Sequence, residues 1–138
     1  MITIKKQEIV KLEDVLHLYQ AVGWTNYTHQ PEMLEQALSH SLEIYVALDG
    51  DAVVGLIRLV GDGFSSVFVQ DLIVLPTYQR QGIGSNLMKE ALADYNDAYQ
   101  VQLATEQTEK NLGFYRSLGF ETLSTYDCTG MIWVDREK

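Results

Sequence analysis

A strand, a glycine-rich turn and a helix follow one another in the middle of this chain, and they constrain its fold more than any other feature. The apolar run VFVQDLIVL at 67–75 is typical of a buried strand, and Pro76 ends it. After the turn QRQGIGS at 79–85, apolar residues three and four apart predict an amphipathic helix. Another strand is predicted at 99–105. Two strands joined through a helix should lie parallel, through a right-handed crossover.

The rest of the pattern adds antiparallel strands and more helices around this unit. Further strands are expected at 2–6, 43–49 and 52–60 and in the last two segments, FETLST and CTGMIWV, and further helices at 12–22, from Pro31, and after Thr105 or Thr108. The segment 24–30 reads as a polar-aromatic loop, and FETLST and CTGMIWV as a closing antiparallel pair. The order β-α-α-β-β-β-α-β-α-β-β predicts an α/β (α+β mixed) fold, with a mixed, mostly antiparallel sheet and flanking helices.

Length, charge and cysteine content narrow the class of protein. The 138 residues fit a single domain, 1–138. A net charge of −9 argues against nucleic acid, which selects basic surfaces, and suits a cationic substrate weakly. The single cysteine, Cys128, cannot form an internal disulfide, and no run of residues suggests a signal peptide, a membrane span or a metal site. We therefore expect a cytoplasmic protein with no membrane partner.

The glycine turn has the chemistry of an anion site. The start of a helix offers amide donors without intrahelical partners, and glycines let an anion approach the backbone. Arg80 could add a positive charge. A Walker loop would need Lys-Ser/Thr after Gly84, and a dinucleotide fingerprint would need glycine in place of Leu87. A plain helix start, with glycines only for packing, is the alternative.

Two motifs in the chain resemble those of one known family. The pattern Gln79-x-x-Gly82-x-Gly84, between DLIVLP and SNLM, is similar to the acetyl-CoA signature of the GNAT N-acetyltransferases. Downstream, NLGFYRSLGFE at 111–121 is similar to the second signature of that family, a helix that ends in FYxxxGF. The order of the elements matches as well, so the resemblance covers nearly the whole chain.

The resemblance implies acetyl-CoA as the acyl donor, CoA as a product and no metal. The amides of the turn would hold the pyrophosphate, and pantetheine would lie where strand 67–75 splays from strand 99–105. The implied cofactor-binding residues are Leu72, Ile73, Val74, Gln79, Arg80, Gln81, Gly82, Ile83, Gly84, Ser85, Asn111 and Tyr115. Thr108 stands where many relatives have asparagine, which puts one contact to CoA in doubt.

Two residues are candidates for proton transfer. Tyr115 stands where relatives place the general acid, and a phenol of pKa about 10 stays protonated at pH 7; the alternative is a core tyrosine. Asp71, on the predicted central strand, could serve as a base if its pKa is raised, or could simply bond to loop amides. Because side chains alternate along a strand, we expect Gln70 and Asp71 to face opposite sides of the sheet.

The acceptor is expected to be a small primary amine, contacted by Trp24 and Tyr27. The stretches LYQAVGW, SHSLEIYVAL and GMIW are similar to the plastid and cyanobacterial serotonin-type (arylalkylamine) N-acetyltransferases. Two alternatives stay open: a protein acetyltransferase acting on a lysine or an N-terminal amine, and a non-catalytic CoA-binding regulatory module. Dimers are common among relatives of this family, so the resemblance also allows a homodimer.

Overall fold

The computed structural model describes residues 1–135 and residue 137. The chain divides into two compact units, 1–104 and 105–138, which are described in turn. No helix among the described residues has the length and apolar character to cross a membrane.

One sheet of five strands forms the centre of the first unit. Its strands are β1 (Ile2–Gln7), β2 (Glu43–Asp49), β3 (Ala52–Gly61), β4 (Ser66–Val74) and β5 (Gln100–Leu103), and they pair in this order. All neighbours are antiparallel except β4 and β5, which are parallel. The parallel pair confirms the crossover expected on both sides of the glycine turn. The mixed, mostly antiparallel sheet confirms the predicted fold class.

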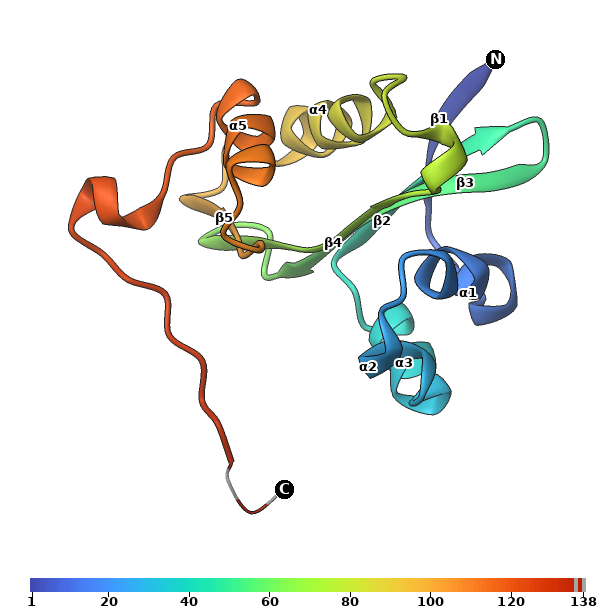
Figure 1. Ribbon diagram of the computed structural model, residues 1–138, viewed down its shortest axis with the longest axis horizontal. Helices are drawn as coiled ribbons and strands as arrows, with labels where there is room; N and C mark the ends of the chain where they lie inside the picture. Colours follow the sequence, from blue (N-terminus) through green and yellow to red (C-terminus); the bar gives the residue numbers. More distant parts are fainter. Residues whose placement is uncertain (136, 138) are drawn as a thin grey trace. The chain divides into compact units, whose positions relative to one another are not determined.

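Helices cover both faces of this sheet. They are α1 (Leu12–Ala21), α2 (Thr25–Thr28), α3 (Pro31–Ser39) and α4 (Ile83–Tyr95), and a short 3-10 helix, η1 (Pro76–Tyr78), follows β4. Figure 1 shows α4 on one face and α1, α2 and α3 on the other. The single turn α2 lies inside the segment 24–30, which was expected to be a loop.

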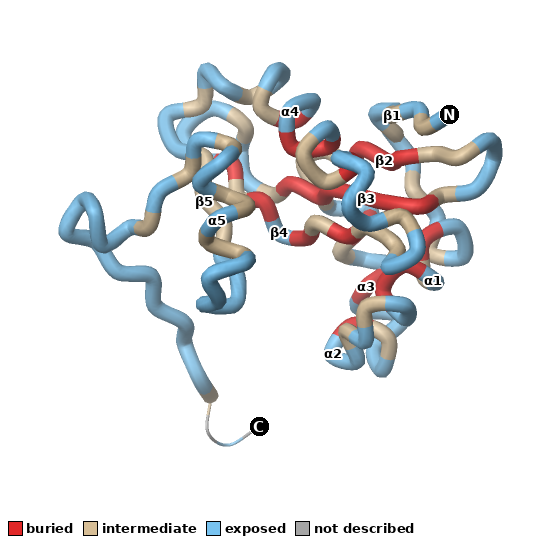
Figure 2. Tube along the Cα trace, turned by 45° about the horizontal axis from the view of Figure 1, so that its top comes forward, coloured by how far each residue is buried: buried red, intermediate tan, exposed pale blue. Residues whose placement is uncertain are grey.

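The core lies between the sheet and the three N-terminal helices, with a second layer under α4. Buried stretches run along β2, β3 and β4 in Figure 2. Leu18 and Leu34 from the helices pack with Leu56 of β3 in one apolar cluster, and each is fully buried. Burial of this apolar surface fixes the positions of α1 and α2, and with them the aromatic residues that the helices carry.

The second unit contains α5 (Glu109–Ser117) and a 3-10 helix, η2 (Leu123–Tyr126). Thr108 caps α5, because its hydroxyl accepts a hydrogen bond from the Asn111 amide at 3.1 Å. Gly119 ends the helix with φ 98°, a left-handed conformation that glycine adopts without strain. Of the two starts predicted from the sequence, Thr105 and Thr108, the helix thus begins after Thr108.

The expected closing pair of strands is absent from the described residues. FETLST contains η2, and CTGMIWV carries no regular secondary structure. Asp127 has φ 57°, and the Cys128 amide bonds to the Leu123 carbonyl, so a tight turn replaces the end of the first strand. A strand is stable only beside another strand, and neither segment pairs with the five-stranded sheet in this chain.

Candidate active site

The glycine turn connects the end of β4 to the first turn of α4. Gly82 is the N-cap residue of α4, with φ 78°, and no side chain caps the helix. A Cβ atom at Gly82 would meet nothing within 4 Å, so the space above the turn is open. The first amides of α4 are therefore free of intrahelical acceptors and accessible, which fits the phosphate groups of CoA.

Arg80 adds backbone strain to the same turn. It has φ 67°, a conformation that non-glycine residues rarely adopt. The Gln79 side chain holds the turn against the strand, because its Nε2 atom donates to the Val74 carbonyl at 3.2 Å. Left-handed residues at positions 80 and 82 turn the chain sharply into α4. Strain of this kind persists only where the surroundings impose it, and it is concentrated at functional sites.

The strands β4 and β5 separate near this turn. They pair from Ser66 with Gln100 to Val69 with Leu103, where β5 ends. The last part of β4, which carries Leu72, Ile73 and Val74, pairs on its other side with β3 alone. Its second edge is thus left without a strand in the described part of the sheet, as the resemblance implied for pantetheine.

A buried ion pair lies beside this segment. Arg58 of β3 donates from Nε to Asp71 Oδ2 of β4 at 2.7 Å, and both side chains are about 95% buried or more. Burial, the largest single effect, lowers the pKa of Arg58, but the charge and hydrogen bond of Asp71, together with Tyr19 and Tyr27, outweigh it and raise the pKa overall. The guanidinium therefore stays charged.

Two tyrosines complete the contacts of Asp71. The Tyr19 hydroxyl donates to Oδ2 and the Tyr27 hydroxyl to Oδ1, both at 2.9 Å. Burial, and then the charge of Asp71, raise the pKa of both phenols. Three protein donors thus occupy three of the roughly four acceptor positions of the carboxylate, and Oδ1 accepts from Tyr27 alone. The role of Asp71 as a general base stays a prediction.

A β-bulge corrects the expected orientation of the neighbouring residue. Arg58 pairs with Asp71 and Leu59 with Val69, so Gln70 has no partner on β3. The Gln70 side chain reaches the Tyr27 hydroxyl at 3.5 Å, the same group that bonds to Asp71. Gln70 and Asp71 therefore do not face opposite sides of the sheet, because the bulge interrupts the alternation.

Three aromatic rings form an aromatic cluster, which we define as Tyr19 of α1, Trp24 at the N-cap of α2, and Tyr27 of α2. The ring centroids of Tyr19 and Tyr27 are 5.1 Å apart, and Trp24 lies 6.2 Å from each. Tyr27 is buried and Trp24 is half-buried. The structure thus brings together Trp24 and Tyr27, the two residues predicted to contact substrate, and joins them to Asp71.

Sequence reasoning missed two members of this network. Tyr19 lies within the helix predicted at 12–22, and nothing in the local sequence distinguishes it from a core residue. Arg58 did carry a signal, because it is the one charged residue in the strand AVVGLIRLV. A charge inside such a run requires a buried partner, and an acidic residue on the neighbouring strand was available.

In the second unit, Tyr115 lies on α5 between two phenylalanines. Its ring centroid is 5.0 Å from that of Phe114 and 6.0 Å from that of Phe120. Burial raises the pKa of Tyr115, and a hydrogen bond to Thr105 opposes only part of this effect. The phenol therefore stays protonated at neutral pH, as a general acid must.

The side chains of Asn111 and Thr108 already have partners within the second unit. The side-chain amide of Asn111 donates to the Glu106 carbonyl at 3.2 Å, and the Thr108 hydroxyl caps α5 by accepting from the Asn111 backbone amide.

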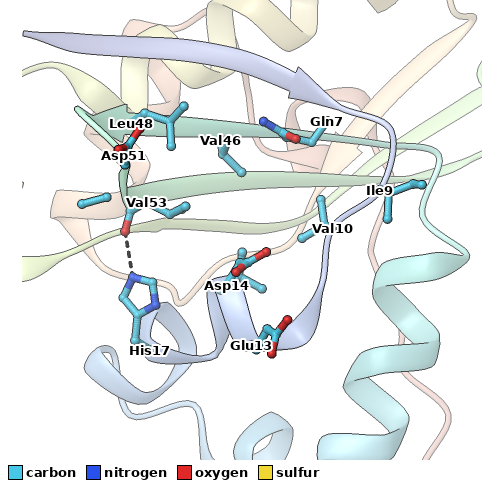
Figure 3. Close-up of a pocket in the computed structure, with 12 residues that line it drawn as sticks. Gln7, Ile9, Val10, Glu13, Asp14, His17, Val46, Leu48, Asp51 and Val53 are labelled. Carbon is cyan, nitrogen blue, oxygen red and sulfur yellow. Dashed lines mark hydrogen bonds between the residues drawn. The ribbon is translucent and has the colours of Figure 1, made fainter.

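A separate pocket lies between α1 and the β2–β3 hairpin. It has a volume of about 540 Å³, and Figure 3 shows the side chains that line it. His17 points toward the hairpin and donates from Nε2 to the Val53 carbonyl at 2.7 Å. The lining of this pocket includes no residue predicted to act in catalysis or to bind cofactor or substrate, so we do not assign the pocket to the chemistry of the glycine turn.

Among the described residues, no group of three or more His, Cys, Asp or Glu side chains could hold a metal ion.

Comparison with known proteins identifies the family. The model of the acetyltransferase (GNAT) domain matches residues 40–122 of the chain, which include the glycine turn and Tyr115. The chain belongs to the GNAT acetyltransferase family. The family predicted from the two signatures is thus confirmed.

Two solved structures of similar proteins differ widely in sequence identity to this GNAT protein. A GNAT-family acetyltransferase from Streptococcus pneumoniae TIGR4 is 85% identical, with a TM-score of 0.92 over 99% of both chains. A GNAT acetyltransferase from Elizabethkingia anophelis, solved with acetyl-CoA bound, shares the fold at 21% identity and a TM-score of 0.64, over 87% of this chain and 76% of the other. Acetyl-CoA is therefore bound by a GNAT protein that shares this fold.

A curated plant protein is also similar. Serotonin N-acetyltransferase 2, chloroplastic, from Oryza sativa subsp. japonica is 34% identical over 95 residues, which are 66% of this chain. The chain spans about half of the rice protein, 48% of its length.

Proposed function

We propose that this protein transfers the acetyl group of acetyl-CoA directly to the primary amine of a small molecule, in the cytoplasm. The open, uncapped N-terminus of α4 behind Gly82 is the observation that carries the proposal. Net charge is −9, so a site for phosphates needs local amide donors, and this turn supplies them. The free edge of β4 beside it offers backbone groups to pantetheine.

The reaction sets three requirements. An alkylamine of pKa about 10.4 must lose a proton, which costs about 4–5 kcal/mol at pH 7. Its nitrogen then attacks the thioester carbonyl, the C–N bond forms and the C–S bond breaks. A backbone amide near Val74 would stabilise the oxyanion that develops. The thiolate that leaves, of pKa about 8.5, needs one proton from a weak acid.

Tyr115 would donate that proton. Its raised pKa keeps the phenol protonated, and its place in the second signature is the place of the acid among relatives. The proton lost by the amine would go to Asp71, directly or through water. Alternatively, Asp71 acts as a positioning residue that holds Tyr27 in place.

The aromatic cluster favours a small acceptor with an aryl or ammonium group. An ammonium can lie over a ring, and an aryl group can stack on one. The rice relative is named for serotonin, an arylalkylamine. The similarity supports a primary amine attached to an apolar body.

The experiment is a comparison of wild type with Tyr115→Phe in a thiol-release assay with acetyl-CoA. The amine panel contains tryptamine, phenethylamine, a polyamine, amino acids and a lysine peptide. We expect one class of small amine to be turned over, and the substitution to lower kcat about 10²–10⁴-fold. The matched control is Tyr99→Phe, because Tyr99 is 82% exposed and its loss of a hydroxyl should leave kcat unchanged.

Each alternative predicts a different result. Preference for the lysine peptide over every small amine would favour a protein acetyltransferase. Binding of CoA without turnover of any amine would favour a regulatory module and would contradict the proposal. Equal activity of Tyr115→Phe and wild type would remove Tyr115 as the acid while leaving the reaction intact.

A second comparison separates the two roles of Asp71. We expect Asp71→Asn to reduce turnover of an ordinary alkylamine strongly. If Asp71 is the base, a fluorinated amine that is already neutral at pH 7 should be affected much less. If Asp71 positions Tyr27, both amines should lose activity by the same factor.

A further inference from the structure

The pocket between α1 and the β2–β3 hairpin has no part in the reaction proposed above. Its volume of about 540 Å³ lies in the range of pockets that hold small organic ligands, roughly 300–1,000 Å³. All of its lining residues fall between positions 7 and 53, so its shape depends on the first unit alone. Figure 3 shows side chains of α1 and side chains of the strands on opposite sides of this space. A pocket of this size can hold a second ligand.

The strand side of the pocket is apolar. Val46 and Leu48 are two residues apart on β2 and share one face of the sheet, and Leu48 pairs with Val53 of β3. Val46 is buried, whereas Leu48 and Val53 are half-buried and pack against the main apolar cluster. Ile9, which lines the same pocket, is 79% exposed. The core thus continues to the surface here, and the apolar part of a ligand would remove this surface from water.

The other side of the pocket is acidic. Glu13 and Asp14 belong to the first turn of α1, and Asp51 belongs to the turn between β2 and β3. None of these carboxylates forms an ion pair within the described residues. Acids at the start of a helix stabilise it through the helix dipole, which would account for Glu13 and Asp14 but not for Asp51. Carboxylates from two separate elements therefore line one apolar pocket.

The placement of these carboxylates favours an organic cation over a metal ion. A metal ion needs several acidic or histidine ligands that converge on it, and the described residues contain no such group of three or more. His17 is also engaged, because its Nε2 atom donates to the Val53 carbonyl at 2.7 Å. No lysine or arginine lines the pocket, and Lys5, which lies opposite Val46 on β1, is not part of the lining. An ammonium group attached to carbon would meet both the acidic and the apolar side.

We propose that this pocket binds an organic cation, an ammonium group on an apolar body, at a site separate from the glycine turn and from the aromatic cluster. The ammonium group lies beside the carboxylates of α1 and of the hairpin turn, and the apolar body covers Leu48 and Val53. Binding involves no covalent step and does not depend on which amine accepts the acetyl group. The net charge of −9 adds a long-range attraction for any cation.

The first test is a titration of the protein with benzyltrimethylammonium, followed by calorimetry. This cation has an aryl body and no N–H bond, so it cannot accept an acetyl group and its binding is measured without turnover. We expect saturable binding to wild type. The variant Glu13→Gln/Asp14→Asn/Asp51→Asn should bind about tenfold more weakly, because each exposed carboxylate contributes a modest attraction and all three are lost.

The matched control for this variant is Glu32→Gln/Glu35→Gln/Asp97→Asn. It removes the same number of charges from exposed positions outside the pocket, with Glu32 and Glu35 on α3 and Asp97 in a turn. The control should bind the cation as wild type does. Equal weakening of the two triple variants would show an effect of net charge alone and would overturn the proposal. Binding to wild type that does not saturate would overturn it as well.

A second test locates the cation on the wild-type chain by NMR, so it does not depend on a variant that fails to fold. We expect the methyl signals of Val10, Leu48 and Val53, which line the pocket, to shift as the cation is added. The indole signal of Trp24 and the amide signal of Gly82 should stay in place. Shifts confined to Trp24 would place the cation on the aromatic cluster, and the proposed site would be wrong.

Discussion

At the scale of single residues, the Arg58–Asp71 pair connects the sheet of the first unit to its N-terminal helices. Two charges removed from water are stable together only when each is fully hydrogen-bonded. Here Asp71 accepts from Arg58, from Tyr19 of α1 and from Tyr27 of α2, and Arg58 Nη1 also donates to the Ala37 carbonyl of α3 at 3.4 Å. The pair therefore joins strands β3 and β4 to all three N-terminal helices. It holds the aromatic cluster against the strand that ends at the glycine turn.

We expect Arg58→Met to lower the free energy of unfolding by about 3–5 kcal/mol, because Asp71 is left buried without its cation. Urea unfolding followed by circular dichroism measures the loss. The double variant Arg58→Met/Asp71→Leu should recover part of it, since no charge stays buried. A double variant as unstable as the sum of the two single variants would contradict this account.

The pKa of Tyr115 leads to a prediction about pH. A phenol whose pKa is raised above about 10 keeps its proton at every pH below that value, so the acid form is lost only above pH 10. We therefore expect no decline of kcat caused by Tyr115 between pH 7 and about 9. A steady-state pH profile of kcat tests this. A fall with an apparent pKa below 9 that is absent in Tyr115→Phe would exclude the assignment.

At the scale of elements, the turn into α4 matters more than the helix itself. Its geometry depends on two residues with positive φ, Arg80 and Gly82, which lead the chain into α4. A side chain at such a position costs about 1–2 kcal/mol, whether or not a ligand binds there. Stability and ligand affinity can therefore be separated by comparing two glycines with the same backbone conformation.

Gly82→Ala and Gly23→Ala form such a pair. Gly82 has φ 78° and Gly23 has φ 71°, and a Cβ atom at either meets nothing within 4 Å. Both variants should lose similar stability in urea. Only Gly82→Ala should weaken acetyl-CoA binding, by at least about tenfold in isothermal titration, because strain relief at position 82 reorients the amides of the turn. Equal affinities of the two variants would argue for glycines that serve packing alone.

At the scale of the whole molecule, the net charge of −9 opposes the approach of an anionic ligand such as acetyl-CoA. Amide donors at the start of α4 act only at short range, so they must outweigh this long-range repulsion for the ligand to bind. Binding therefore depends on the local geometry of the glycine turn and not on the overall charge of the chain.

Local signals in the sequence determined the order of the five paired strands and of the longer helices, the parallel pair and the glycine turn, because strand periodicity, Pro76 and the glycines act through neighbouring residues. They also limited the cap of α5 to Thr105 or Thr108 and indicated the family. Only the tertiary structure decided that Arg58 neutralises Asp71, since the partners come from different strands and pair across the sheet. It likewise decided the bulge at Gln70, which interrupts the alternation of side chains along β4. It also decided that residues 128–134 form no strand. A segment with the pattern of a strand forms a strand only where a neighbouring strand shares its hydrogen bonds. The sequence of the segment alone does not specify that neighbour.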